Sequence, residues 1–453
     1  MGNRTISVLD TGAVANTEQL QTAAFQKALD TAFEWGGATV TVPAGKYRIG
    51  GLRLRSNTTL HLLSGAQLYG SRDVQDYCIL PDQLEPLPEA WCTEKCWEPF
   101  VKGVQRCYDF MKPGGRWGNA LIRAIGAENV AIIGEKDTLL DGRDCYDELG
   151  EEKYRGPHGI SMHHCRNITL KGYTIANTGN WAHCIFDSEN LHMDGVTAIA
   201  GHDGIHMTSC RNMVIENSEF YTGDDCVAGF ANVNVAVSHC ACNTACSGMR
   251  FGGTNAYISD CRFFGPAKYF FRGSLSLEEK ISGARAHMPH RTNMLSVFTY
   301  YADFSVDIPV APGNIVIENC TVSNVDRFLH YNFSGNERWQ SHRPLRSVRF
   351  ENITADGIRM PLTAYGSPDT PLDLALANVS VTFDPAVENT AFLHAAYYDR
   401  IVMENVRVDK KPDAPLIKSW TKGGETVMRN VSYEAPEQEM LQYTEEPFVC
   451  KSI

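Results

Sequence analysis

Residues 167–258 repeat one short pattern, in which an asparagine precedes a strand-like run with alternating apolar residues. The copies read Asn167-Ile-Thr-Leu, Asn190-Leu-His-Met, Asn212-Met-Val-Ile, Asn234-Val-Asn-Val and Asn255-Ala-Tyr-Ile. The steps between successive asparagines are 23, 22, 22 and 21 residues. A period of this length with short strands is typical of one coil of a parallel β-helix. The repeat therefore predicts an all-β solenoid.

The same pattern continues on both sides of this stretch. It returns as Asn129-Val-Ala-Ile-Ile, Asn314-Ile-Val-Ile, Ser347-Val-Arg-Phe, Asn378-Val-Ser-Val and Arg400-Ile-Val-Met. Leucine-rich repeats have a similar period, but these copies lack the leucine spacing and contain no helical stretch. The recurrent asparagine suits a turn, because asparagine tolerates left-handed backbone and can stack on its copies in neighbouring coils. We assign these asparagines no chemical role.

The open end of a solenoid needs a cap, because its end strand and its core would otherwise meet water. Residues 16–34 are predicted to form a capping helix. Asn16 can cap the first turn, and Phe25, Leu29 and Phe33 recur every four residues on one face.

Two long stretches interrupt the repeat within what we expect to be a single β-helix domain, residues 1–453. Its segments are an N-terminal cap with the first coils (1–79), an insertion (80–118), the coils that carry the candidate site (119–265), a second insertion (266–312) and C-terminal coils with a tail (313–453). Insertions in a regular scaffold commonly contact substrate, and contacts between subunits are the alternative.

The composition excludes several classes of protein. The chain has 453 residues and a formal charge of −12 at pH 7. This charge counts against a nucleic-acid partner, which needs a basic face. It also disfavours a long polyanionic substrate, unless a local basic cleft overrides it. No apolar run reaches the roughly 18 residues of a membrane span, so we expect no membrane partner.

The N-terminal stretch and the cysteines both favour an intracellular setting. Residues 1–12 contain no apolar segment of a secretory signal, so we expect a cytoplasmic protein. The 15 cysteines are scattered, and we expect most to be small buried hydrophobes rather than disulfides. Two cysteine pairs have short spacings, Cys92 with Cys96 and Cys240 with Cys242. Neither has a second pair at zinc-finger spacing, so we expect no bound metal.

One coil carries a cluster of carboxylates. Asp203 lies in Gly-His-Asp-Gly-Ile-His, and Asp224 and Asp225 lie in Thr-Gly-Asp-Asp-Cys-Val-Ala. Asp203 and Asp224 are 21 residues apart, which is one repeat, so they should lie on adjacent coils about 4.8 Å apart. Crowded carboxyls split their pKa values, so that one can act as a general acid while another activates water. A calcium site or solvated turn aspartates are the alternatives.

The chain resembles family 28 of the glycoside hydrolases, the bacterial polygalacturonase-like proteins. The resemblance rests on Asp10-Thr-Gly-Ala, Gly36-Gly-Ala-Thr-Val-Thr-Val-Pro-Ala-Gly-Lys-Tyr, Gly65-Ala-Gln-Leu-Tyr-Gly-Ser, Leu140-Asp-Gly, Cys210-Arg-Asn-Met-Val-Ile-Glu-Asn and Gly223-Asp-Asp-Cys-Val-Ala. It implies a right-handed parallel β-helix, an inverting hydrolase and a bacterial origin. By position, Asp224 would be the general acid, and Asp203 and Asp225 would hold and deprotonate the attacking water.

The chain departs from this family at the positions that recognise the uronate. Where the family has Asn-Thr-Asp, only Asp203 is kept, after Gly201 and His202. Cys246 and its neighbours replace a Gly-His-Gly stretch, and of an Arg-Ile-Lys motif at most Arg272 remains. The resemblance therefore implies that the catalytic carboxylates are kept while substrate recognition has changed.

Five residues are candidates for substrate binding: His202, His206, Arg250, Arg272 and Trp181. Strand alternation points the side chain of Arg250 outward, where a solvated arginine is the alternative to a substrate contact. Family position makes Trp181 a sugar platform, and a buried aromatic residue is the alternative. The histidines at 158, 163 and 164 have no partners at metal-ligand spacing and are interpreted as turn or surface residues.

These observations favour an inverting, exo-acting glycoside hydrolase that needs no cofactor. Its substrate would be a plant- or microbe-derived oligosaccharide of the pectin or cell-wall type other than plain polygalacturonate. Assembly of the protein into a homo-oligomer is left open. One alternative is another sugar-active β-helix enzyme: a lyase, with Arg272 or Arg250 as base and aspartate-bound calcium, an epimerase or a glycosyl transferase. The other is a β-helix that binds carbohydrate without catalysis.

Overall fold

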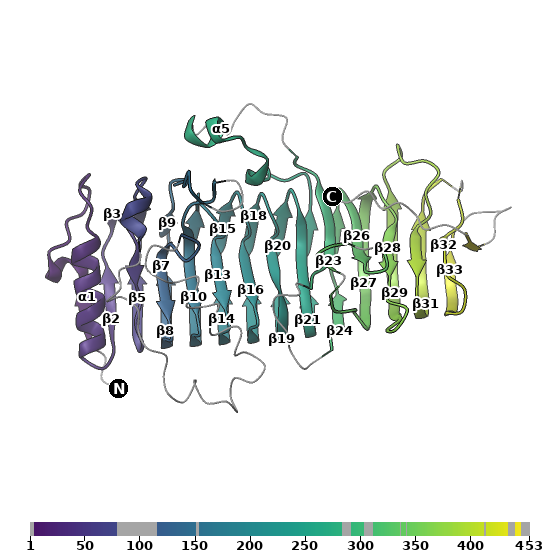
Figure 1. Cartoon of the computed structure of the whole chain (residues 1–453), viewed down its shortest axis with the longest axis horizontal. Coiled ribbons are helices and arrows are strands. Elements are labelled where there is room, and N and C mark those ends of the chain that lie inside the picture. Colours follow the sequence, from purple (N-terminus) through teal and green to yellow (C-terminus); the bar gives the residue numbers. More distant parts are fainter. Residues whose placement is uncertain are drawn as a thin grey trace. The chain divides into compact units, whose positions relative to one another are not determined.

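The computed structural model describes residues 4–78, 116–150, 154–282, 291–302, 311–335, 337–340, 342–411, 414–433 and 440–444. The chain divides into two compact units, whose strands and helices are labelled in Figure 1. The N-terminal unit comprises Met1–Asp224 and Tyr269–Arg291, and the C-terminal unit comprises Asp225–Lys268 and Thr292–Ile453. Each unit is described by itself, so the single-domain organisation stays a prediction.

The strands of the N-terminal unit stack in three parallel rows, one strand of each row per coil. The first row is β1 (Thr5–Ser7), β2 (Ala38–Val42), β5 (Thr58–Leu62), β8 (Glu128–Gly134), β11 (Arg166–Lys171), β14 (Glu189–Asp194) and β17 (Arg211–Glu216). The second row is β3 (Gly45–Ile49), β6 (Ala66–Gly70), β9 (Leu139–Asp141), β12 (Thr174–Ala176), β15 (Thr197–Ala200) and β18 (Glu219–Thr222). The third row is β4 (Leu52–Arg53), β7 (Ala120–Ile125), β10 (His158–His163), β13 (His183–Phe186) and β16 (Ile205–Thr208).

The C-terminal unit repeats this arrangement, with several long strands that bend from one row into the next. Its first row is β19 (Val227–Ser238), β21 (Ser247–Ser259), β24 (Gly313–Glu318), β27 (Ser347–Ile358), β29 (Leu372–Phe383), β31 (Tyr398–Asp409) and β33 (Glu425–Ser432). Its second row is β20 (Ala241–Thr244), β22 (Arg262–Phe264) and β25 (Thr321–Ser323), continued by the ends of β27, β29 and β31. The beginnings of β19 and β21 open its third row, followed by β23 (Met294–Tyr300), β26 (Val325–Asn332), β28 (Leu362–Tyr365), β30 (Leu393–Ala396), β32 (Ile417–Ser419) and β34 (Leu441–Tyr443).

The register follows from the repeat. Ile168, Leu191 and Met213 are partners on successive first-row strands, and all three are buried in the core of the N-terminal unit. Each of these strands has an asparagine with left-handed backbone as its second residue, with φ of 56° at Asn167 and 58° at Asn190. Asn190 Nδ2 donates to Asn167 Oδ1 at 3.1 Å, and similar bonds join the asparagines of other coils into ladders. The predicted parallel β-helix and the structural role of its asparagines are confirmed.

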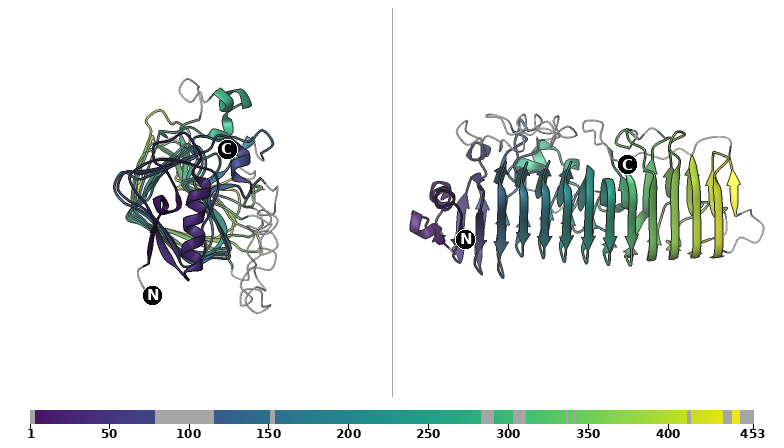
Figure 2. Two further views of the ribbon diagram at one scale, coloured as in Figure 1. Left: turned by 90° about the vertical axis from the view of Figure 1, so that its left-hand side faces the viewer. Right: turned by 90° about the horizontal axis from the view of Figure 1, so that it is seen from below.

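A helix lies across the N-terminal end of this unit, as predicted (Figure 2, left). Helix α1 (Thr22–Glu34) buries Phe25 and Leu29, whereas Phe33 is half-buried beneath the guanidinium of Arg55. The predicted cap was wrong. Asn16 lies six residues before the helix, and its Oδ1 accepts a hydrogen bond from the Lys46 backbone N–H because Asn16 occupies a left-handed turn.

The two predicted insertions are described to different extents. Nearly all of 80–118, including Trp91 and Trp97, lies outside the described residues. Within 266–312, η5 (Arg272–Ser274) and α5 (Leu277–Ser282) belong to the N-terminal unit, whereas β23 continues the third row of the C-terminal unit. The interruption is therefore shorter than predicted. Two further short helices, η1 (Val8–Thr11) and η2 (Val74–Tyr77), flank the first coils.

The described cysteines are free thiols, and all but Cys78 and Cys246 are buried, as the sequence predicts. Because the chain is mostly strand, long helices are rare. No helix among the described residues is long and apolar enough to cross a membrane.

Candidate active site

The candidate carboxylates of the N-terminal unit lie at one corner of the coils, where the second row of strands turns into the third. Asp203 lies between β15 and β16, and Asp224 follows β18. Ala200 pairs with Thr222, and the Gly223 N–H donates to the Ala200 carbonyl at 2.8 Å. The two corners therefore belong to neighbouring coils, as the spacing of 21 residues predicts. We call the described residues of segments 142–150, 154–157, 177–182, 201–204 and 223–224 the corner turns.

Asp203 is held by an imidazole. Its Oδ2 lies 2.8 Å from Nδ1 of His206, and the Asp203 side chain is 5% exposed. The His206 ring stacks on the indole of Trp181, with ring centres 3.8 Å apart and planes inclined by 5°. Trp181 comes from the corner turn of the preceding coil. The structure thus brings together three predicted site residues from two corner turns and strand β16.

Asp224 faces an arginine that the sequence analysis missed. Nη2 of Arg155 lies 3.9 Å from Oδ2 of Asp224, and the Asp224 side chain is 13% exposed. Arg155 Nη1 donates to Asn180 Oδ1 at 3.1 Å, and its guanidinium lies 5.8 Å from the Trp181 ring centre. Arg155 lies outside the repeat, in the long corner turn before β10. Because this corner turn has no counterpart in the repeat, the repeat spacing gives no signal for Arg155.

Arg272 is engaged within the protein. Its Nη1 donates to Asp144 Oδ1 at 2.5 Å and to the Thr178 carbonyl at 3.3 Å, and its backbone N–H donates to the Gly201 carbonyl. Burial lowers its pKa to about 10, so the guanidinium stays charged at neutral pH. A Cβ on Gly201 would lie only 2.7 Å from that of Arg272, so the glycine is required for this contact. A direct contact with substrate stays a prediction for Arg272.

Two histidines of these coils, His202 and His158, are buried and neutral. Burial, followed by the charges of Arg155 and Arg272, holds the pKa of His202 well below its usual value. Burial lowers the pKa of His158 to about 3, and Arg155 adds to the shift.

All three histidines at 158, 163 and 164 are buried. The predicted turn or surface position was wrong for His158 and His163, which lie on β10, whereas His164 is a turn residue with φ of 54°. Aromatic rings cover two of them. Trp117 and Trp181 lie beside His158, with ring centres 5.4 and 5.3 Å away, and Phe186 stacks on His163.

Asp225, the next residue after Asp224, belongs to the C-terminal unit. Its Oδ1 accepts a hydrogen bond from the Ser247 N–H at 2.9 Å, and its Oδ2 lies 3.8 Å from Arg250 Nη1. The Asp225 side chain is 2% exposed. Arg250 lies between the buried Met249 and Phe251, which confirms that its side chain points outward. Aromatic rings flank the Arg250 guanidinium, because the centre of the Tyr301 ring is 4.2 Å away and that of Trp339 is 5.7 Å away.

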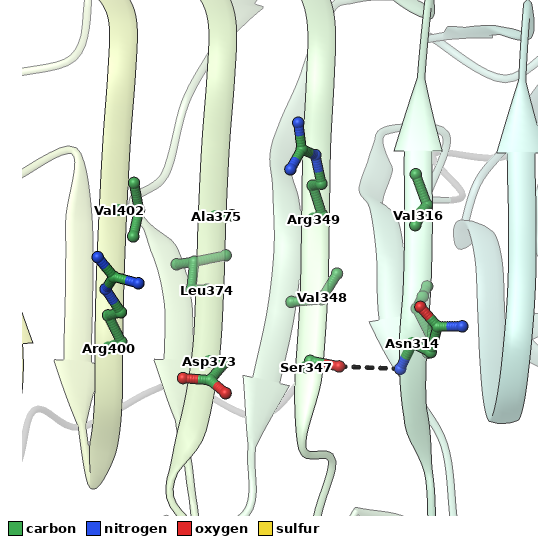
Figure 3. Close-up of a pocket in the computed structure, with 11 residues that line it drawn as sticks. Asn314, Val316, Ser347, Val348, Arg349, Asp373, Leu374, Ala375, Arg400 and Val402 are labelled. Atoms are coloured by element: carbon green, nitrogen blue, oxygen red, sulfur yellow. Dashed lines mark hydrogen bonds between the residues drawn. The ribbon is translucent and has the colours of Figure 1, made fainter. Parts of the chain in front are cut away.

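A separate hollow of about 330 Å³ lies on the first row of the C-terminal unit (Figure 3). It is lined by residues of β24, β27, β29 and β31, with Arg349 and Arg400 beside an apolar floor that includes Val316 and Val402. Both arginines form ion pairs with glutamates, Arg349 with Glu351 and Arg400 with Glu425. None of the predicted site residues lines this hollow.

Comparisons with known proteins agree with the resemblance to family 28. Residues 116–257 match the family described as glycosyl hydrolases family 28. A "Probable polygalacturonase" of Vitis vinifera is 30% identical over 49% of this chain and 43% of its own length. The "Exo-poly-alpha-D-galacturonosidase" of Dickeya chrysanthemi is 27% identical over 49% of this chain and 41% of its own length. The chain thus spans less than half the length of these curated relatives.

The fold is shared with a solved structure over most of both chains. The hyperthermoactive exopolygalacturonase of Thermotoga maritima matches with a TM-score of 0.63 and 18% identity, over 90% of this chain and 92% of that chain. This likeness supports the predicted right-handed β-helix. The match over residues 116–257 covers Asp203, Asp224 and Asp225. The coils that carry these three carboxylates therefore match family 28 of the glycosyl hydrolases.

Proposed function

We propose that the protein is a polygalacturonase-like glycosidase that hydrolyses an oligosaccharide with inversion and without a cofactor. The observation that carries this proposal is the pair of corner turns on neighbouring coils. They present two carboxylates with different partners, because Asp203 is paired with His206 and Asp224 faces Arg155. Two carboxyl groups in unlike surroundings are what glycoside hydrolysis requires.

The proposed roles are those that the resemblance to family 28 implies by position. Asp224 gives its proton to the glycosidic oxygen as the bond from that oxygen to the anomeric carbon breaks. Water attacks the opposite side of the anomeric carbon and loses a proton to Asp203 or Asp225. The His206 bond fixes the orientation of the Asp203 carboxylate, and the Ser247 N–H fixes that of Asp225. The sugar leaves with its anomeric configuration inverted.

The proposed substrate is a pectin-type oligosaccharide cleaved from one end. Support comes from the names of the matched proteins, two of which are an exo-poly-α-D-galacturonosidase and an exopolygalacturonase. The altered recognition residues argue for a substrate other than plain polygalacturonate. The half-buried Trp181 has one ring face covered by His206, so a stacked sugar would use the other face.

The decisive experiment compares the wild type with Asp224→Asn on short acidic and neutral oligosaccharides. We expect kcat to fall about 10²- to 10⁴-fold, because the proton donor is lost. Asp137→Asn is the matched control, since Asp137 is an exposed turn residue with φ of 60°, which asparagine tolerates. Proton NMR of the first product should show inversion.

Other outcomes would contradict the proposal. A product of retained configuration excludes inversion, and an unsaturated product that absorbs ultraviolet light indicates a lyase. A wild type that binds the oligosaccharides but cleaves none of them indicates a non-catalytic binding protein.

A further inference from the structure

The C-terminal unit contains a buried arginine without an acidic partner among the described residues. Arg327 lies on β26 and is 5% exposed. Its Nη1 donates to Thr363 Oγ1 at 2.9 Å and lies 3.2 Å from His330 Nδ1, and its Nη2 lies 2.7 Å from the Met360 sulfur. Its buried Nε has no hydrogen-bond partner among these residues. A buried charge is costly unless it is paired, so these neutral contacts leave the guanidinium uncompensated.

The surroundings of Arg327 are basic. Strand register places one polar residue per coil in a single row: Arg250, Thr299, His330, Thr363, His394 and Lys418. Burial, together with Arg327 and Arg250, lowers the pKa of His330 to about 3. Burial, together with Lys418 and Arg327, lowers the pKa of His394 to about 4. Both histidines are therefore neutral at neutral pH, and the positive potential comes from the arginines and Lys418.

A nearby arginine shows the opposite arrangement. Arg359 has a side chain that is 40% exposed, yet it lies 3.8 Å from Asp326 and 3.3 Å from Asp384. If only stability mattered, these two carboxylates would pair with the buried Arg327 rather than with the exposed Arg359. Exposed ion pairs contribute little to the free energy of folding. Among the described residues, these two carboxylates thus pair with the exposed Arg359, and the buried guanidinium of Arg327 has no carboxylate partner.

We propose that Arg327, which is positioned by its bond to Thr363 and lies beside His330, binds the carboxylate of an acidic sugar unit of the substrate. This inference rests on the proposed function. Arg250 lies beside Asp225. In the row of polar residues, Arg250 and His330 are two strands apart, which is about 10 Å at the usual strand spacing. The bound carboxylate therefore belongs to a sugar unit beyond the one at Asp225. The site forms a local basic region in an acidic protein.

The test measures binding rather than turnover. Isothermal titration calorimetry compares trigalacturonate with its fully methyl-esterified form, on the Asp224→Asn protein and on the same protein with Arg327→Gln. We expect the Asp224→Asn protein to prefer the free acid. Arg327→Gln should weaken acid binding about 10- to 100-fold and leave ester binding unchanged, because only the acid forms a charge-assisted bond. Arg359→Gln is the matched control and should leave both affinities unchanged.

Two results would overturn the inference. One is equal affinity of the Asp224→Asn protein for trigalacturonate and its methyl ester, and the other is an equal loss of affinity for both ligands in the Arg327→Gln variant. Thr363→Val keeps the guanidinium and removes one of its acceptors, so a folded Thr363→Val protein should still prefer the acid. If Arg327→Gln does not fold, loss of this preference in Thr363→Val overturns the inference, and its retention supports it. Because binding needs no hydrolysis, failure of the proposed reaction leaves this test intact.

Discussion

Two kinds of turn in the N-terminal unit differ in how much they vary from coil to coil. The bends at the start of the first-row strands repeat an asparagine, which is the second residue of β11, β14 and β17, and these asparagines form a hydrogen-bonded ladder. The corner turns share no residue pattern, and they supply Arg155, Trp181, Asp203 and Asp224. Repetition therefore marks the scaffold, because every coil needs a residue that adopts the same left-handed backbone at this bend. Variation at a fixed corner marks the candidate site, because each coil adds a different chemical group there.

The largest expected effect comes from the corner turn with Asp203. Asp203→Asn should lower kcat about 10²- to 10⁴-fold, because the amide cannot accept a proton from water. The free energy of unfolding, from urea titration, should change much less than this rate. Steady-state kinetics on an oligosaccharide that the wild type cleaves checks the prediction. An unchanged kcat would remove Asp203 from the catalytic set and weaken the link between corner turns and function.

The spacing of the repeat was sufficient to predict the rows of strands and the alignment of Asp203 with Asp224. Both are consequences of a fixed coil length. Arg155 could not be found in this way, because its corner turn is long and has no counterpart in the repeat. The burial of His158 was also missed, since Trp117 and Trp181 cover it from distant parts of the sequence. Periodicity thus predicts what lies on neighbouring coils, and it says little about what covers them.

The next effect in size concerns Arg155. Arg155→Gln should lower kcat/KM about 10- to 100-fold, because the guanidinium that faces Asp224 and interacts with Trp181 is lost. Arg155→Lys should restore only part of this activity, since a lysine lacks the planar fork of donors. Separate values of kcat and KM would show whether Arg155 acts on binding or on the reaction. Full activity of Arg155→Gln would contradict a role for this corner turn.

The buried histidine beside these turns predicts a pH dependence of stability. The pKa of His158 is about 3 in the folded protein and about 6.5 when unfolded. The unfolded chain therefore binds a proton that the folded protein does not, and stability falls as the pH drops from about 6.5 toward 3. Between pH 6.5 and 5 this histidine should account for about 2 kcal/mol of the loss.

The variant His158→Phe isolates this contribution. It keeps a ring against Trp117 and Trp181 but cannot be protonated, so urea unfolding should show a shallower loss of stability between pH 6.5 and 5. A slope identical to that of the wild type would mean that His158 does not control this dependence.

The smallest effect tests the ladder itself. Asn190 has φ of 58° and is joined to Asn167 and Asn212 through its side-chain amide. Asn190→Ala should lower the free energy of unfolding by about 2 kcal/mol, because alanine is strained in left-handed backbone and two exposed hydrogen bonds are lost. Asn190→Gly should cost about 1 kcal/mol, since glycine adopts this backbone without strain. Both variants should keep the kcat of the wild type. A lower kcat in the folded Asn190→Gly protein would show that the ladder and the corner turns are coupled, and the division between a repeated scaffold and a variable site would then fail.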